Sequence, residues 1–296
     1  MLRLGVLVAG FFALSFGANA DPSASDPFGR YVSSFDGVQI FATEAGPRDG
    51  PSFLFIHGLS QSHAAWSLQY DSAFAQDKHV VAMDLRGHGN SEKTYDVKSY
   101  QDSRTMAEDV SAVIKAFGLK RPILVGWSYG AIIVGDYLAF YGDNNLSGVV
   151  LVSGALHTNI SEEFFGAGAL HLYGMLSDEL STQFEASLAF VENMPADKVS
   201  PDEVKSLFRA SLMTPPYVRR AIAGRTADHR NVLDRLTAPL MVIHGAKDPV
   251  LTSDLARHTA GLKHDTVLKI YDGVGHAPFL EASERFNADL SAFAAR

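Results

Sequence analysis

Short apolar runs separated by Gly, Pro or Asp constrain the fold of this chain more than any other feature. The middle runs are apolar without alternation, which is typical of strands buried on both faces of a parallel sheet. The first run, Val38–Ala42, does alternate, so we expect it at the edge of the sheet. The expected strands are Val38–Ala42, Ser52–His57, His79–Asp84, Pro122–Gly126, Gly148–Ser153, Leu240–His244 and Val267–Tyr271.

Between these runs, apolar residues recur at helical spacing. In residues 106–117 they fall at i, i+4, i+7, i+8 and i+11, and Gly118 follows as a glycine that ends a helix. Phe286, Leu290 and Phe293 repeat the pattern near the C-terminus. Strands that alternate with helices predict an α/β fold with a mostly parallel central sheet flanked by helices.

The alternation stops between residues 155 and 234, where the pattern is helical throughout. One helix start is well marked, because Ser200-Pro201-Asp202-Glu203 combines a capping box with a proline at the first helical position. A strand-free stretch of about 80 residues exceeds the usual length of a crossover connection. We therefore expect 155–234 to be a helical cap inserted between core segments 21–154 and 235–296, with additional layer helices as the alternative.

The first twenty residues have the pattern of an export signal. Arg3 precedes an apolar run from Leu4 to Phe16, and Ala18-Asn19-Ala20 supplies small residues before a cleavage point. The run is shorter than the roughly 20 residues that span a bilayer, which argues against a membrane anchor. We expect a signal peptide at 1–20 and a periplasmic or secreted mature protein that is not inserted in a membrane.

Composition excludes several kinds of chemistry. The chain has no cysteine, so it has no disulfide, thiolate nucleophile or cysteine-ligated metal. Its 25 Lys and Arg against 33 Asp and Glu give a net charge of −8. The basic residues do not cluster in the sequence as they do in proteins that bind nucleic-acid phosphates. Histidine pairs at metal-ligand spacing and glycine-rich phosphate loops are also missing. We therefore expect no nucleic-acid partner, no metal and no cofactor.

A sharp turn joins the expected strand 122–126 to a helical segment. Gly126-x-Ser128-x-Gly130 between a strand and a helix is the nucleophile-elbow pattern. The turn forces strained backbone angles on the serine, and side chains two residues away on either side would collide. A bare G-x-S-x-G arises often by chance, but this context makes Ser128 the candidate nucleophile.

A serine hydroxyl needs a base, and the base needs an orienting carboxylate. Behind such an elbow the order along the chain is serine, acid, histidine. Asp248 follows the strand 240–244 and His276 follows the strand 267–271, so both belong at the sheet edge where Ser128 lies. Ordinary turn chemistry for Asp248 and a solvated loop position for His276 are the alternatives. We expect these three residues to form a catalytic triad.

Two backbone N–H groups are candidates for stabilising an oxyanion. One belongs to Tyr129, directly after the serine, and the other to Leu59, in the loop after the strand 52–57. His57 starts that loop and is interpreted as structural. Trp127 and Trp66 either line an acyl or alcohol pocket or belong to the core, since large aromatic side chains serve both uses.

These motifs together resemble the α/β-hydrolase superfamily over about residues 30–296. The resemblance rests on His57-Gly58, on the D-x-R-G-x-G-x-S turn at 84–91, on the elbow, and on Asp248 and His276. Within the superfamily the chain is similar to the capped group of bacterial esterases, lactonases and cofactor-free haloperoxidase-like enzymes. Haloalkane dehalogenases and epoxide hydrolases carry aspartate where this chain has Ser128, so those activities are not expected.

The expected function is therefore that of an exported serine hydrolase. It would cleave an ester or lactone of a small apolar acid through an acyl-enzyme. Two alternatives stay open. In one, peroxide replaces water on the same triad, as in a cofactor-free haloperoxidase or perhydrolase; in the other, the pocket of a non-catalytic homologue binds a small ligand.

Overall fold

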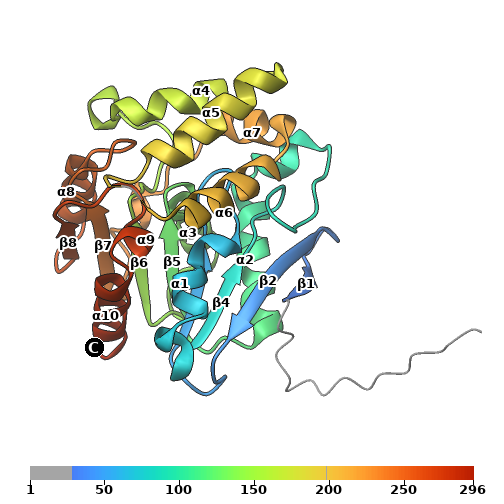
Figure 1. The fold of residues 1–296 in the computed structure, drawn as a ribbon. Helices are drawn as coiled ribbons and strands as arrows, with labels where there is room; N and C mark the ends of the chain where they lie inside the picture. The colour runs from blue at the N-terminus through green and yellow to red at the C-terminus, as the bar shows by residue number, and fades with distance from the viewer. Residues whose placement is uncertain (1–28, 198) are drawn as a thin grey trace, which may run out of the picture.

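The computed structural model describes residues 29–197 and 199–296, so the predicted signal peptide at 1–20 lies outside the described residues. In this part of the chain eight strands form one sheet in the order β1-β2-β4-β3-β5-β6-β7-β8 (Figure 1). From β4 to β8 in this order all neighbouring strands are parallel, whereas the pairs β1–β2 and β2–β4 are antiparallel. The predicted mostly parallel sheet is confirmed. The strands are β1 (Arg30–Ser33), β2 (Gln39–Ala45), β3 (Ser52–Ile56), β4 (His79–Met83), β5 (Ile123–Trp127), β6 (Gly148–Val152), β7 (Leu240–Gly245) and β8 (Val267–Tyr271).

The edge of the sheet differs from the expectation. Strand β1 pairs with β2 and covers it, so the alternating run Val38–Ala42 is not at the edge, and that prediction is wrong. Only Val32 of the four residues in β1 is buried. The strand therefore contains no apolar run, and the sequence pattern does not indicate it.

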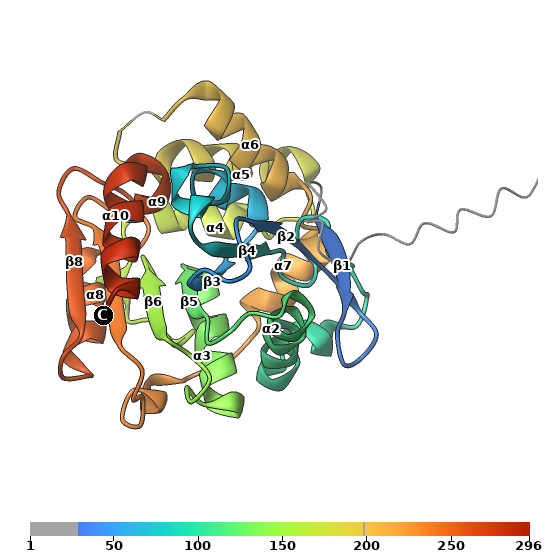
Figure 2. The ribbon, with the colours of Figure 1, turned by 90° about the horizontal axis from the view of Figure 1, so that it is seen from below.

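Helices cover both faces of the sheet (Figure 2). The helices α2 (Ser103–Phe117) and α3 (Tyr129–Tyr141) bury apolar side chains against one face, and α10 (Ser283–Ala294) packs on the other with α1 (Ser67–Tyr70) and α9 (Pro278–Glu281). The predicted helix at 106–117 is confirmed, and Gly118 ends it with φ +63°. The helix α8 (Ser253–Gly261) packs on β7 and β8. Short 3-10 helices lie at His63–Trp66, Ala73–Gln76, Val97–Tyr100, Glu162–Phe164, Ala167–Leu170 and Arg230–Val232.

The chain between β6 and β7 is mainly helical, and its four α-helices lie above the sheet in Figure 1. The predicted capping box is present at the start of α6, where Ser200 Oγ accepts from Glu203 N–H and Glu203 accepts from Ser200 N–H. One isolated β-bridge, between His157 and Asp228, joins the beginning of this segment to its end. The helices are α4 (His171–Gly174), α5 (Leu180–Asn193), α6 (Pro201–Leu212) and α7 (Pro216–Ala223), and we refer to residues 155–234 as the cap.

A buried ionic cluster fastens the end of the cap to helix α3. Arg225 donates to Asp136 Oδ2 at 2.6 Å and to the Tyr129 hydroxyl at 3.0 Å. The ring of His229 lies 2.7 Å from Asp136 Oδ1. Because Asp136 and Arg225 are both fully enclosed, each charge depends on the other for compensation. The helix that begins beside Ser128 is thus held against the cap.

We predict that Asp136→Asn lowers the free energy of unfolding by about 3–5 kcal/mol, because it leaves the Arg225 charge buried without an ionised partner. The matched control is Asp228→Asn, which breaks a half-exposed pair with Arg230 (2.9 Å) and is expected to cost less than about 1 kcal/mol. Urea unfolding of both variants measures the difference. Equal losses would contradict the role given to the buried pair.

Candidate active site

Ser128 lies in the turn from β5 to α3, with φ +53° and ψ −117°. Few residues other than glycine adopt such angles, so the turn is strained. The Ser128 N–H donates to the Val152 carbonyl at 2.9 Å, which holds the turn against β6. A Cβ atom at Gly126 would lie 2.5 Å from the carbonyl oxygen of Gly130. The glycines of the elbow are therefore required by close backbone packing.

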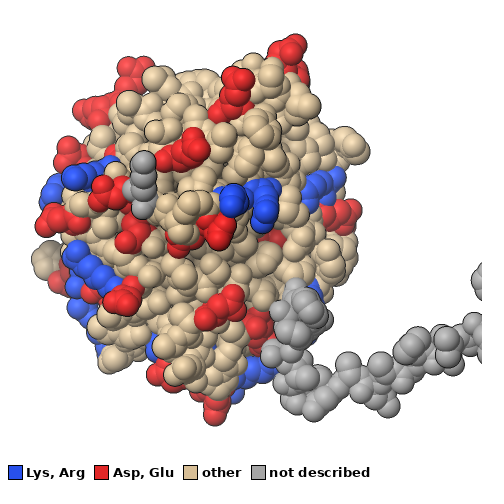
Figure 3. Space-filling model, in the orientation of Figure 1, with Lys and Arg blue, Asp and Glu red and all other residues tan. Residues whose placement is uncertain are grey.

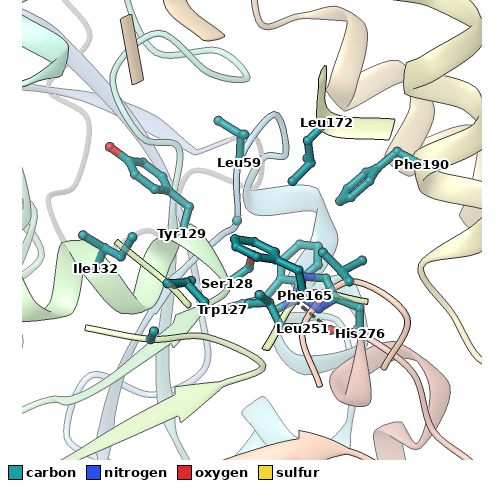
Figure 4. Close-up of a pocket in the computed structure, with 14 residues that line it drawn as sticks. Leu59, Trp127, Ser128, Tyr129, Ile132, Phe165, Leu172, Phe190, Leu251 and His276 are labelled. Carbon is teal, nitrogen blue, oxygen red and sulfur yellow. Dashed lines mark hydrogen bonds between the residues drawn. The ribbon is translucent and has the colours of Figure 1, made fainter. Parts of the chain in front are cut away.

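His276 is oriented by Asp248. The Nδ1 atom of His276 lies 2.8 Å from Asp248 Oδ2, and because an ionised carboxylate can only accept, Nδ1 carries the proton. The other ring nitrogen, Nε2, is buried and has no hydrogen-bond partner in the described residues. Ser128 and His276 line one cavity (Figure 4). The hydroxyl does not reach Nε2 here, and catalytic hydrogen bonds commonly tighten only when substrate binds.

The Asp248 carboxylate is held ionised by a dense set of donors. Its Oδ1 accepts from the backbone N–H groups of Val250 (2.8 Å) and Leu251 (3.0 Å), and its Oδ2 lies 3.0 Å from His244 Nε2. Burial alone would raise the pKa of Asp248, but the charge of His276 and the hydrogen bonds from His244 and His276 hold it well below its usual range. Asp248 can therefore stabilise an imidazolium at His276.

His244 is a contact of the acid that the sequence pattern does not reveal. Its Nε2 lies 2.8 Å from the Leu251 carbonyl as well as near Asp248. Both neighbours are acceptors, so Nε2 carries the proton. The sequence pattern places His244 at the end of a buried strand. The loop after β7 then brings Asp248 and the Leu251 carbonyl to its ring.

One carboxylate holds the loop on both sides of His276. Glu281 accepts from the N–H groups of Gly275 (2.8 Å) and Ala277 (3.1 Å), and also from Ala196 N–H (2.8 Å) in the cap. Burial raises the pKa of Glu281. The backbone N–H of His276 itself donates to the Met194 carbonyl at 2.8 Å. Sequence reasoning misses Glu281 because its acceptor role arises only when the loop and the cap fold together.

The two predicted oxyanion donors lie beside Ser128. Strands β3 and β5 are parallel neighbours in which Ile56 pairs with Gly126, so the loops after them meet at one edge. Leu59 and Tyr129 both line the cavity with Ser128. Tyr129 is the first residue of α3, where an N–H group has no acceptor within the helix. The arrangement can therefore offer two backbone donors to a negatively charged oxygen.

His57, at the start of the Leu59 loop, is a neutral buried residue. The Leu85 N–H donates to His57 Nε2 at 3.0 Å, so the ring proton sits on Nδ1, which donates to the Gly58 carbonyl at 2.7 Å. Burial lowers the pKa of His57 to about 4. Its ring thus ties the Leu59 loop to the loop after β4 and offers no free nitrogen.

The cavity has a volume of about 140 Å³ and apolar walls. Phe165, Leu172 and Phe190 of the cap line it (Figure 4). Phe165 is paired with Leu251, another lining residue, by an isolated β-bridge. Among the residues that the structure describes, no Asp, Glu, Lys or Arg side chain lines it. The site therefore suits an uncharged, apolar group.

The two tryptophans have different places. Trp127 lines the cavity, and its Nε1–H donates to the His276 carbonyl at 2.8 Å, so it also supports the histidine loop. Trp66 does not line the cavity. It is fully buried between Phe279 and Phe55, with ring centroids 4.3 and 4.9 Å away. Trp66 therefore belongs to the core, as the alternative stated. It ends the 3-10 helix His63–Trp66, which directs its ring to the face of the sheet that α10 covers.

The described residues contain no cluster of three or more His, Asp or Glu side chains that could hold a metal ion. In the same residues no helix has the length and apolarity needed to cross a membrane. On the face drawn in Figure 3, Lys and Arg are scattered among Asp and Glu.

Comparison with known proteins agrees with the fold. A model of the Alpha/beta hydrolase family matches residues 53–289. A bifunctional esterase/perhydrolase, DCH, from Acinetobacter calcoaceticus is 30% identical over 277 residues, which cover 89% of this chain and 98% of the relative. A non-heme chloroperoxidase from Streptomyces lividans is 28% identical and covers 88% and 98% of the two chains. Among solved structures, the esterase RhEst1 from Rhodococcus sp. ECU1013 aligns with a TM-score of 0.83 at 31% identity, over 90% of this chain and 98% of its own.

The neutral state of His57 predicts a pH dependence of stability. Its pKa is about 6.5 in the unfolded chain and about 4 when folded, so between these values the unfolded state binds more protons. The free energy of unfolding should therefore fall as pH falls from 6.5 to 4, by about 3 kcal/mol from this residue. In His57→Gln the fall should be smaller by that amount, as measured by urea unfolding at several pH values.

The control is His264→Gln, at an exposed ring, which should keep the wild-type dependence. A His57→Gln variant with the full wild-type fall would show that another group causes it.

Proposed function

The chain belongs to the alpha/beta hydrolase family, and we propose that it is an exported serine hydrolase that cleaves a carboxylic ester or lactone. One observation carries the proposal: His276, with Nδ1 bound to Asp248 and Nε2 unpaired, shares an apolar cavity with a strained serine, Ser128. Relatives named as esterases add support for the reaction class. Export, suggested by the sequence of residues 1–20, stays a prediction.

We propose a step for each residue. Ser128 Oγ attacks the carbonyl carbon while His276 Nε2 takes its proton, and Asp248 stabilises the resulting imidazolium. The N–H groups of Leu59 and Tyr129 bind the oxyanion, each donor contributing ~3 kcal/mol to transition-state stabilisation. His276 then gives its proton to the leaving oxygen, which leaves an acyl group on Ser128. Water then attacks the acyl carbon while His276 Nε2 takes its proton. The bond from that carbon to Ser128 Oγ breaks, the proton passes from His276 to Ser128 Oγ, and the acid is released.

The cavity indicates the substrate class. A volume of about 140 Å³ is below the roughly 300–1,000 Å³ of common ligand pockets, so the acyl group is short. Because none of the described residues that line the cavity is Asp, Glu, Lys or Arg, a charged acyl group would lose its hydration without compensation. We propose an uncharged, apolar acyl chain of a few carbons.

Perhydrolysis is a second candidate, because the relative from Acinetobacter calcoaceticus is named both esterase and perhydrolase. Hydrogen peroxide would replace water at the acyl-enzyme, its proton would go to His276, and the acyl group would leave as a peracid. The same Ser128, His276 and Asp248 serve both reactions.

We predict that Ser128→Ala lowers kcat/KM for p-nitrophenyl acetate and butyrate by roughly 10³-fold or more, because the nucleophile is removed. The wild type should turn over these short esters faster than the decanoate. The control is Ser181→Ala, at an exposed serine of α5, which should match the wild type.

Turnover retained by Ser128→Ala would overturn the assignment. Bromination of monochlorodimedone in acetate, peroxide and bromide separates the second candidate. Bromination that Ser128→Ala abolishes supports perhydrolysis, and its absence in an active esterase excludes it.

A further inference from the structure

A buried arginine joins the cap to the loop that carries Leu59. Arg219, on α7, is fully enclosed, and among the described residues it makes no ion pair with Asp or Glu. Its Nε donates to Ser60 Oγ at 3.1 Å, its Nη1 to the Met175 carbonyl at 3.1 Å and its Nη2 to the Ser211 carbonyl. Burying an arginine without an acidic partner carries a desolvation penalty, so the three hydrogen bonds of Arg219 must offset it.

The cap supplies most of the compensation for the Arg219 charge. Met175 follows the last residue of α4, and Ser211 lies in the last turn of α6. Carbonyl groups at the C-terminal end of a helix lack intrahelical donors and carry partial negative charge. The guanidinium therefore finds its acceptors only when α4, α6 and α7 are assembled around it.

The remaining acceptor, Ser60, sits in a strained turn. Its φ is +55°, an angle that favours glycine, and Gln61 N–H donates to the Gly58 carbonyl at 3.2 Å across the turn. Leu59 is the other central residue of this turn, so a change in the backbone of Ser60 would shift the turn that carries the Leu59 N–H. The Ser60 side chain is fully buried, and its hydroxyl accepts from Arg219.

We propose that Arg219 is a positioning residue that holds the Ser60 turn, and with it the Leu59 N–H, in the geometry that binds the oxyanion. The cap thereby does more than enclose substrate, since its assembly and the formation of the oxyanion site are coupled through one guanidinium. The inference rests on the proposed function of Ser128. It implies that loss of Arg219 weakens transition-state binding and leaves ground-state binding in the apolar cavity largely intact.

The test compares kcat and KM for p-nitrophenyl acetate, with active sites titrated by a fluorophosphonate so that only folded enzyme is counted. Arg219→Met removes the donors and keeps an apolar stem, whereas Ser60→Ala removes only the acceptor. We expect each to lower kcat about 10- to 100-fold, with KM changed less than about threefold. The double variant should be no slower than the slower single variant, because both break one contact.

The matched control is Arg220→Met, the next residue of α7, which is partly exposed and donates to Asp178 at 2.6 Å. It should keep the wild-type kcat. A purely structural Arg219 would lower the melting temperature without changing kcat per titrated site. If Arg219→Met does not fold, Ser60→Ala decides, because it deletes a single oxygen.

A wild-type kcat in Ser60→Ala, an effect confined to KM, or multiplicative losses in the double variant would overturn the inference. Failure of the proposed function has a different signature: the wild type itself would neither turn over esters nor react with the fluorophosphonate.

Discussion

The strained turn at Ser128 is the feature on which the arrangement of the surrounding strands and loops depends. A residue with φ +53° and ψ −117° persists only where its neighbours fix it. The Val152 carbonyl binds its N–H, and glycine at 126 leaves room for the backbone of α3 to return close to β5. Because β5 through β8 are parallel, the loops after β7 and β8 emerge at the same edge. Asp248 and His276 therefore lie at the same sheet edge as Ser128.

The cap is hydrogen-bonded to the loop of His276 and to the loop of Leu59, the two loops on which the proposed chemistry depends. Met194 accepts from His276 N–H, and Glu281 joins Ala196 of the cap to the histidine loop. On the other side, Arg219 donates to Ser60 in the loop of Leu59. A cap bonded in this way lines the cavity and also holds the loop of His276, the proposed base. Substrate range and catalytic power are therefore expected to vary together when the cap is altered.

Features that depend on a short stretch of sequence could be predicted from the sequence alone. Apolar runs indicate the buried strands, and glycine spacing with strand order places Ser128, Asp248 and His276 at one sheet edge. Strand β1 has no such signal, since one buried residue in four makes no pattern. The sequence pattern also does not predict the supporting contacts. Arg219 and Ser60 are 159 residues apart in the sequence, and hydrophobic periodicity gives no information about contacts at that separation. Trp66 shows the same limit, because proximity in sequence to Leu59 does not decide which face of the sheet its ring enters.

The central claim is that His276 and Asp248 make Ser128 a nucleophile. Its most direct test is the mass of the protein after reaction with a fluorophosphonate, followed by peptide mapping. The account predicts one phosphonyl group per chain, located on Ser128, with labelling slowed by orders of magnitude in His276→Ala. Labelling elsewhere, or labelling of Ser128 that is equally fast without His276, would contradict it.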